Sequence, residues 1–234
     1  VYKRQVGYSI DLCKRIASNV STTIGKEVEI EYIPVTSENR FSAVSSGKID
    51  ILCGSTTKTL SRSKKVDFTQ NTFVTGATFM TLAGKQFNEL AELDGRKVGV
   101  VKGTTTEETL KKLLKETLTN AEVVTYDSAK EALDGLRGGE IRAFTSDQVV
   151  LIGLVITAED QDNFAIAPQV FSFEPFALAV KRNDADFRLI ADSALSQLYR
   201  TGQILQIYSK WFGGFAKEMP PMHQALYKLN STPE

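Results

Sequence analysis

The chain has 234 residues, of which 42% are hydrophobic and 24% are charged, an ordinary composition for a globular protein. Lysine plus arginine and aspartate plus glutamate each number 28, so the formal net charge is zero. This balance disfavours nucleic acid or an anionic membrane surface as a partner. No apolar run approaches the ~18 residues that span a bilayer. The length suits one large domain or two small lobes.

The first five residues, Val1 to Gln5, differ from the regular pattern that begins at Val6. They match one reading frame of a transposon end used in sequencing libraries, so one hypothesis makes them an adapter remnant on a truncated gene. The alternative is a native polar lead-in. No secretory signal segment is recognisable in the chain, which says little if its start is truncated.

Apolar spacing predicts the first elements of the chain. A helical pattern covers residues 11–23, and a strand-like alternation covers residues 27–33. A short helix over residues 39–46 and a buried strand over residues 49–53 follow. Alternation of strands with helices favours an α/β sheet with parallel pairing.

The rest of the chain repeats this plan. Four further strands are predicted, over residues 97–101, 123–126, 143–145 and 176–180. Helices are predicted over residues 107–118, 128–138, 184–202 and 204–212. The pair Pro220–Pro221 predicts the start of a C-terminal tail.

The two cysteines both point toward the first core. Cys13 lies on the apolar face of the first helix, and Cys53 ends the buried strand. They form either one disulfide or two buried thiols. Neither belongs to a Cys-x-x-Cys pair, and His223 is the only histidine. The sequence therefore predicts no metal site and no cofactor.

The segment that follows Cys53 carries the strongest functional signal. A buried strand runs into the hydroxyl residues Ser55 and Thr57, and Arg62 comes shortly after. Ligands of open α/β sheets sit beyond the carboxyl ends of strands, and a planar guanidinium suits a carboxylate. The alternative is a polar loop with a solvated arginine.

This segment resembles the polar amino-acid family of bacterial solute-binding proteins that serve ABC importers. The resemblance is carried by Gly-Ser-Thr-Thr followed by Ser-Arg-Ser-Lys-Lys-Val-Asp-Phe-Thr. The resemblance extends over nearly the whole chain, through residues 6–12, 46–50, 103–105, 174–176 and 210–212. Within that family, residues 33–40 and 53–57 are most similar to glutamate/aspartate-binding proteins.

The resemblance implies a two-lobed α/β fold, the type II periplasmic binding protein fold. Each lobe would be a mixed sheet flanked by helices, and the ligand would be trapped in a cleft when the lobes close. Two hinge crossovers would divide the chain into lobe 1 (residues 1–75 plus 177–234) and lobe 2 (residues 76–176). The family's first strand would lie upstream of Val6 and is expected to be missing.

The resemblance also implies residue roles. Arg62 would clamp the α-carboxylate of an amino acid, with Thr57 and Thr105 as hydrogen-bonding helpers. Asp147 would accept the α-ammonium, although taken alone it could be an ordinary surface acid. The roles are physically consistent, because a zwitterion removed from water needs a cation for its carboxylate and an anion for its ammonium.

Ser37 and Arg40 match residues that hold the side-chain carboxylate in glutamate/aspartate binders, and Ser55 would assist them. The alternative for Arg40 is a helix-start arginine that points to solvent. The chain departs from these relatives in two places. It lacks a further arginine of the first strand and a second-lobe histidine near Ser128 or Ala129. Glutamate or aspartate is favoured, and glutamine or another polar amino acid remains open.

The predicted function is a monomeric, non-enzymatic receptor that delivers an amino acid to the membrane subunits of an ABC importer. The predicted location is the periplasm, or a lipid anchor outside the membrane. One alternative is an enzyme of the same fold, a cyclohexadienyl (arogenate/prephenate) dehydratase with Glu174 as general acid. Another alternative is the ligand-sensing domain of a receptor.

Overall fold

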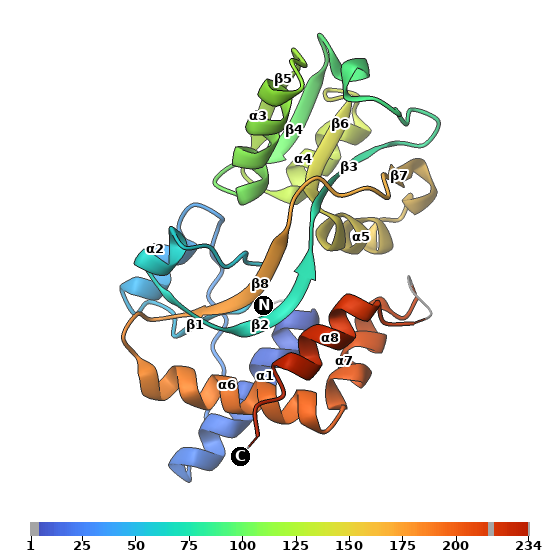
Figure 1. Ribbon diagram of the computed structural model, residues 1–234. Helices are drawn as coiled ribbons and strands as arrows, with labels where there is room; N and C mark the ends of the chain where they lie inside the picture. Colours follow the sequence, from blue (N-terminus) through green and yellow to red (C-terminus); the bar gives the residue numbers. More distant parts are fainter. Residues whose placement is uncertain (1–4, 215–217, 234) are drawn as a thin grey trace. The chain divides into compact units, whose positions relative to one another are not determined.

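The computed structural model describes residues 5–214 and 218–233, which fall into two units. Unit 1 takes its described residues from Val1–Val35, Asn39–Val74 and Pro175–Glu234, and unit 2 consists of Thr36–Glu38 and Thr75–Glu174 (Figure 1). The adapter hypothesis concerns residues 1–5, of which only Gln5 is described. None of the described helices is both long and apolar enough to cross a membrane.

Unit 1 is built on a three-stranded sheet of order β1-β8-β2, in which β1 runs antiparallel to β8. Its strands are β1 (Ile51–Leu52), β2 (Asp67–Thr75) and β8 (Glu174–Val180). Its helices are α1 (Tyr8–Ile24), α2 (Arg40–Ser45), the 3-10 turn η1 (Arg62–Lys64), α6 (Ala185–Arg200), α7 (Gln203–Phe212) and α8 (Pro221–Leu229).

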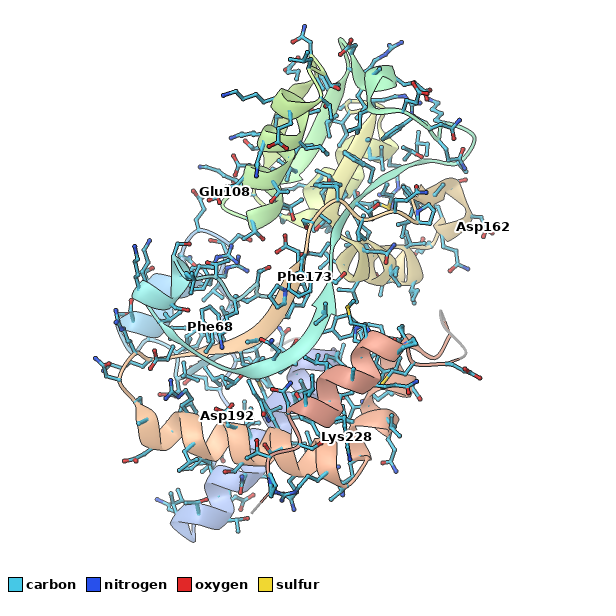
Figure 2. The ribbon with its side chains drawn as sticks, in the orientation of Figure 1. Phe68, Glu108, Asp162, Phe173, Asp192 and Lys228 are labelled. Carbon is cyan, nitrogen blue, oxygen red and sulfur yellow. A yellow bond between two sulfur atoms is a disulfide. The ribbon has the colours of Figure 1, made fainter. Side chains whose placement is uncertain are left out.

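Alternate residues of β8 fill two cores, one on each face of this sheet. Leu178 packs in the cluster formed with α1, α6, α7 and α8, which gather on one side of the sheet (Figure 1). Ala177 and Ala179 pack in the other cluster, with Phe68 of β2 and Val44 of α2 (Figure 2). Helix α2 therefore lies on a sheet that is buried on both faces.

A disulfide joins Cys13 of α1 to Cys53, directly after β1. The sulfur atoms are 2.06 Å apart, and the bridge spans 40 residues of sequence. Of the two states that the sequence left open, the structure shows the disulfide. The bridge fastens α1 to the start of the polar loop that contains Ser55 and Thr57.

Unit 2 is built on a five-stranded sheet of order β5-β4-β6-β3-β7. Strand β4 runs parallel to β5 and β6, and β3 runs antiparallel to β6 and β7. The strands are β3 (Ala77–Leu82), β4 (Lys97–Val101), β5 (Glu122–Tyr126), β6 (Ala143–Asp147) and β7 (Phe164–Ile166). The helices are η2 (Leu90–Leu93), α3 (Thr105–Glu116), α4 (Ala129–Arg137), α5 (Gln148–Thr157) and η3 (Gln161–Asn163).

Neighbouring residues of β3 show how the unit 2 sheet is covered. Phe79 belongs to a core cluster with Leu110 of α3, whereas Met80 belongs to a second cluster with Leu133 of α4 and Leu151 of α5. Successive side chains of a strand point to opposite faces. Helix α3 therefore covers one face, and α4 and α5 cover the other.

One local prediction was wrong, and two others hold only in part. Residues 27–33 form no strand, because no other strand of the described residues lies beside them and alternation alone supplies no hydrogen-bonding ladder. The expected tail at Pro220 contains α8, since a proline fits the first turn of a helix without loss of a backbone bond. Parallel pairing holds for β4 with β5 and β6, whereas β1 pairs antiparallel with β8.

Gly76 allows the chain to enter β3 against the segment before β8. A Cβ at Gly76 would collide with the Ser172 carbonyl oxygen and with the Val170 side chain. We expect Gly76→Ala to destabilise the protein by about 2 kcal/mol or more, because the collision involves backbone. The control is Gly153→Ala inside α5, where a Cβ meets open space. Urea midpoints should fall for the first variant only, and equal midpoints would contradict the steric argument.

Candidate functional site

Arg62 is held at the start of η1 by the loop that precedes it. Its Nη1 donates to the Thr57 carbonyl oxygen at 2.8 Å, and its backbone N–H donates to Thr59 Oγ1 at 3.1 Å. Its guanidinium carbon lies 5.1 Å from the centre of the Phe41 ring, and the side chain is half-buried. A guanidinium is a planar fork of N–H donors whose geometry suits an oxyanion, and these contacts hold that of Arg62 in place.

Arg40 begins α2 and is only 9% exposed. Its Nη1 lies 3.4 Å from both the Ser55 carbonyl oxygen and Thr56 Oγ1. Its guanidinium carbon lies 5.0 Å from the centre of the same Phe41 ring. The alternative of a solvent-directed arginine is wrong for Arg40, because the side chain is buried against this loop. One aromatic ring therefore contacts two guanidinium groups.

The loop between these arginines is anchored to the sheet of unit 1. Thr57 is 5% exposed and forms an isolated antiparallel bridge with Phe176, and Ala177 donates its N–H to the Thr56 carbonyl oxygen at 3.1 Å. Ser55, by contrast, is exposed. The structure thus brings Arg40, Ser55, Thr57 and Arg62 together in unit 1.

In unit 2, Thr105 is the first residue of α3, whose cap is the Thr104 side chain. Its Oγ1 donates to Glu174 Oε2 at 2.9 Å. Glu174 is 2% exposed, and its Oε1 accepts from Ser172 Oγ at 2.8 Å. Ser172 Oγ in turn accepts the Ala77 N–H at 2.9 Å. This chain of bonds fixes the hydroxyl of Thr105 in one orientation.

Asp147 is the last residue of β6 and the residue before α5, and it is half-buried. It stands opposite Ala77 in the β3–β6 pairing, and the next residue, Gln148, donates its N–H to the Gly76 carbonyl oxygen at 2.8 Å. Asp147 ends β6, and Thr105 comes shortly after the end of β4. Because β4 and β6 are parallel neighbours, both residues lie at the carboxyl ends of these strands. Both therefore lie at the same edge of the unit 2 sheet.

Ser37 lies half-buried in the turn of residues 37–39, which begins in the short stretch Thr36–Glu38 assigned to unit 2. The neighbouring Glu38 forms an ion pair with Lys102, with Oε1 3.0 Å from Nζ. The hydrogen bond to this carboxylate raises the pKa of Lys102. Ser37 thus belongs with Thr105 and Asp147 in unit 2, and the ligand role of all seven residues stays a prediction.

Sequence reasoning missed Phe41, Thr56 and Ser172. Phe41 follows Arg40 directly, and an aromatic residue next to a suspected ligand arginine is the one signal that could have found it. Thr56 and Ser172 act through tertiary hydrogen bonds, for which the sequence carries no local signal.

Within residues 5–214 and 218–233, no group of three or more histidine, cysteine, aspartate or glutamate side chains is placed to hold a metal ion.

Solved structures define the class of fold. An ancestral arginine-binding protein bound to arginine matches with a TM-score of 0.77 and 32% identity, over 89% of this chain and 88% of that one. An ancestral amino acid-binding protein, described as a precursor of cyclohexadienyl dehydratase, matches with a TM-score of 0.74 and 27% identity, over 88% of this chain and 85% of that one. The predicted type II periplasmic binding protein fold is confirmed.

The sequence profile of the bacterial extracellular solute-binding proteins, family 3, matches residues 2–214, and the chain belongs to that family. The L-glutamate/L-aspartate-binding protein of Pseudomonas aeruginosa is 29% identical, over 98% of this chain and 78% of its own length. The ABC transporter glutamine-binding protein of Bacillus subtilis is 29% identical, over 88% of this chain and 72% of its own length. The predicted resemblance to the polar amino-acid binders of ABC importers is confirmed.

Proposed function

We propose that this protein is a non-enzymatic receptor that binds free glutamate or aspartate and delivers it to the membrane subunits of an ABC importer. The observation that carries the proposal is the pair of guanidinium groups of Arg40 and Arg62 around the Phe41 ring. Two like charges held at one ring repel each other, and a ligand with two carboxylates offers an anion to each. A neutral or cationic side chain brings no second anion to this pair of guanidinium groups.

The ligand's α-carboxylate is assigned to Arg62 and its side-chain carboxylate to Arg40, assisted by Ser37 and Ser55. The Thr105 hydroxyl has one proton, which it donates to Glu174, so toward a ligand its oxygen is an acceptor. Thr105 Oγ1 and the Asp147 carboxylate therefore both suit the α-ammonium. The backbone N–H groups at the start of α3 suit a carboxylate.

Ligands of other charge fit these residues less well. The glutamine-binding and arginine-binding relatives show that the same fold serves other amino acids. An arginine ligand would bring a third guanidinium toward Arg40 and Arg62, and glutamine would bring one carboxylate where glutamate brings two. These charges favour a dicarboxylic amino acid.

The dehydratase alternative is less well supported. Both carboxylate oxygens of Glu174 accept hydrogen bonds from hydroxyl groups, one from Thr105 and one from Ser172. This arrangement holds a buried carboxylate in place and positions Thr105, whereas a general acid needs a proton directed at the substrate. We therefore assign Glu174 a positioning role.

As part of the same proposal, the receptor acts as a monomer in the periplasm, or held outside the membrane by a lipid anchor.

Calorimetry with a panel of amino acids tests this function. Glutamate or aspartate should bind most tightly, and Arg40→Ala should weaken the acidic ligand by about 2–3 kcal/mol, because a carboxylate loses its charged partner. Binding of glutamine should change less than about fivefold. Arg15→Ala on the exposed face of α1 removes the same charge and should change neither affinity.

Each possible failure has a separate meaning. Equal losses for glutamate and glutamine in Arg40→Ala would reject the side-chain role of Arg40 alone. No binding of any amino acid by the unaltered protein would overturn the proposed function as a whole.

A further inference from the structure

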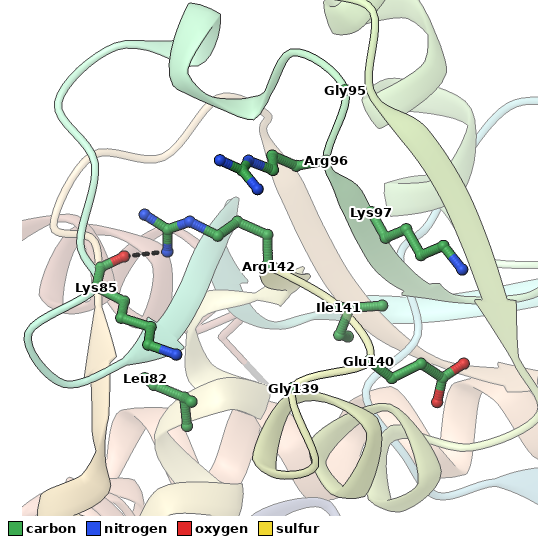
Figure 3. A pocket seen from close by; sticks show the side chains of 9 residues that line it. All are labelled: Leu82, Lys85, Gly95, Arg96, Lys97, Gly139, Glu140, Ile141 and Arg142. Atoms are coloured by element: carbon green, nitrogen blue, oxygen red, sulfur yellow. Dashed lines mark hydrogen bonds between the residues drawn. The ribbon is translucent and has the colours of Figure 1, made fainter.

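A pocket of about 280 Å³ lies at one end of the unit 2 sheet. Lys97 begins β4, Arg142 directly precedes β6, and Leu82 ends β3, so three strand ends form its walls. Lys85 and Arg96 add two further cations from the adjoining loops (Figure 3). The proposed amino-acid site makes no use of this pocket.

Cations outnumber carboxylates in the pocket lining. Its charged residues are Lys85, Arg96, Lys97, Arg142 and Glu140. Lys97 lies 4.0 Å from Glu122, whereas Lys85, Arg96 and Arg142 make no ion pair within the described part of the chain. Among the described residues, the pocket therefore holds three cations that no ion pair neutralises.

Two of the cations are directed at the same space. Figure 3 shows the guanidinium groups of Arg96 and Arg142 extending to the same side of the pocket, where Lys85 also lies, whereas Lys97 and Glu140 extend to the other side. Arg142 is fixed in this direction, because its Nη1 donates to the Lys85 carbonyl oxygen and its guanidinium carbon lies 6.0 Å from the Phe87 ring centre.

One further carboxylate stands near Arg142. The Glu92 carboxylate accepts hydrogen bonds from the backbone N–H groups of Asn88 and Glu89. These bonds lower the pKa of its carboxyl group, and the nearby charge of Arg142 lowers it further, to a smaller extent. Its Oε1 is thus already engaged by two backbone donors, and Glu92 makes no ion pair with Arg142. The arginine remains available to an anion that enters from solvent.

We propose that this pocket is a second binding site of the protein, for a phosphate-type oxyanion held by Arg96, Arg142 and Lys85. Guanidinium groups match the oxygen geometry of phosphate, and a lysine adds a mobile point charge. A volume of about 280 Å³ is large enough to admit a phosphate group. The phosphate could be free in solution or belong to a lipid headgroup.

The site is remote from the residues assigned to the amino acid within unit 2. Thr105 and Asp147 follow the carboxyl ends of β4 and β6, whereas Lys97 and Arg142 lie at the amino ends. A strand of five residues extends about 16 Å. An oxyanion in the pocket therefore contacts neither Thr105 nor Asp147.

The test measures phosphate binding by calorimetry at constant ionic strength, with chloride as the replaced anion. The pocket variant is Arg96→Gln/Arg142→Gln, and the control Arg15→Gln/Lys115→Gln removes two exposed charges elsewhere. We expect the pocket variant to bind phosphate at least tenfold more weakly than the unaltered protein, and the control to be unchanged. Arg96→Gln alone is the control for unfolding, because the Arg96 side chain makes no hydrogen bond or ion pair with the described residues. A loss of phosphate binding in this variant is therefore not a consequence of a disturbed fold.

A second arm separates the two sources of phosphate. Sedimentation with vesicles of phosphatidylglycerol is compared with vesicles of phosphatidylcholine. Binding of inorganic phosphate alone supports a free oxyanion, and binding to the anionic vesicles that the pocket variant loses supports a headgroup. No binding in either arm, or equal losses in the pocket and control variants, would overturn the site.

Discussion

Arg62→Ala is expected to weaken glutamate or aspartate binding by about 3–5 kcal/mol, which is between a hundredfold and a few thousandfold in Kd. The reason is that a carboxylate taken out of water loses its bidentate partner and keeps its desolvation cost. Thr57 would also lose the donor to its carbonyl oxygen, so the loop that positions the hydroxyl groups would loosen. Isothermal calorimetry of the variant measures the loss directly.

Two companion variants separate charge from geometry. Arg62→Lys keeps the charge and removes the planar fork, so it should recover only part of the affinity. Lys65→Ala removes one exposed cation three residues away and should bind like the unaltered protein. A loss below tenfold in Arg62→Ala, or an equal loss in Lys65→Ala, would remove Arg62 from the carboxylate clamp.

Replacement of both Cys13 and Cys53 by alanine is expected to lower the free energy of unfolding by about 4 kcal/mol. The estimate comes from the entropy that a cross-link over 40 residues removes from the unfolded chain. Denaturant unfolding should therefore show a lower midpoint for the variant. Because two units can unfold separately, the transition is to be followed by a probe within unit 1, such as Trp211 fluorescence.

A reducing agent supplies the control for this second prediction. It should lower the midpoint of the unaltered protein toward that of the variant and leave the variant unchanged. A variant within about 0.5 kcal/mol of the unaltered protein would show that the bridge contributes little beyond the packing of α1.

The strands β4, β5 and β6 of unit 2 were predictable because their local pattern and their packing agree. Residues 97–101 are predicted as a strand and form β4, whose apolar residues fill the core clusters on both faces of the sheet. Residues 27–33 have an equally clear alternation and form no strand, because a ladder depends on a partner elsewhere in the chain. Helix α8 was missed because two prolines suggest a break while also suiting a helix start.

The candidate site was predictable in its charged residues and not in their surroundings. Motif order pointed to Arg62 and Thr57, and the structure shows a hydrogen bond between the two. The contact of Arg40 and Arg62 with one ring joins α2 to η1, and a relation between elements of this kind has no signature in either segment alone. The basic pocket of unit 2 was missed for the same reason, since its cations come from separate loops.

The shared Phe41 ring should couple Arg40 and Arg62 energetically. A substitution that shifts the ring to suit one arginine also changes the support of the other, so the free-energy effects of changes at Arg40 and Arg62 should not add. If both arginines bind carboxylates as proposed, ligand preference should depend on the ring and the two arginines together. On these proposed roles, loss of Arg40 alone should weaken a dicarboxylic ligand without strengthening a neutral one, so tight binding of a neutral amino acid would require further substitutions.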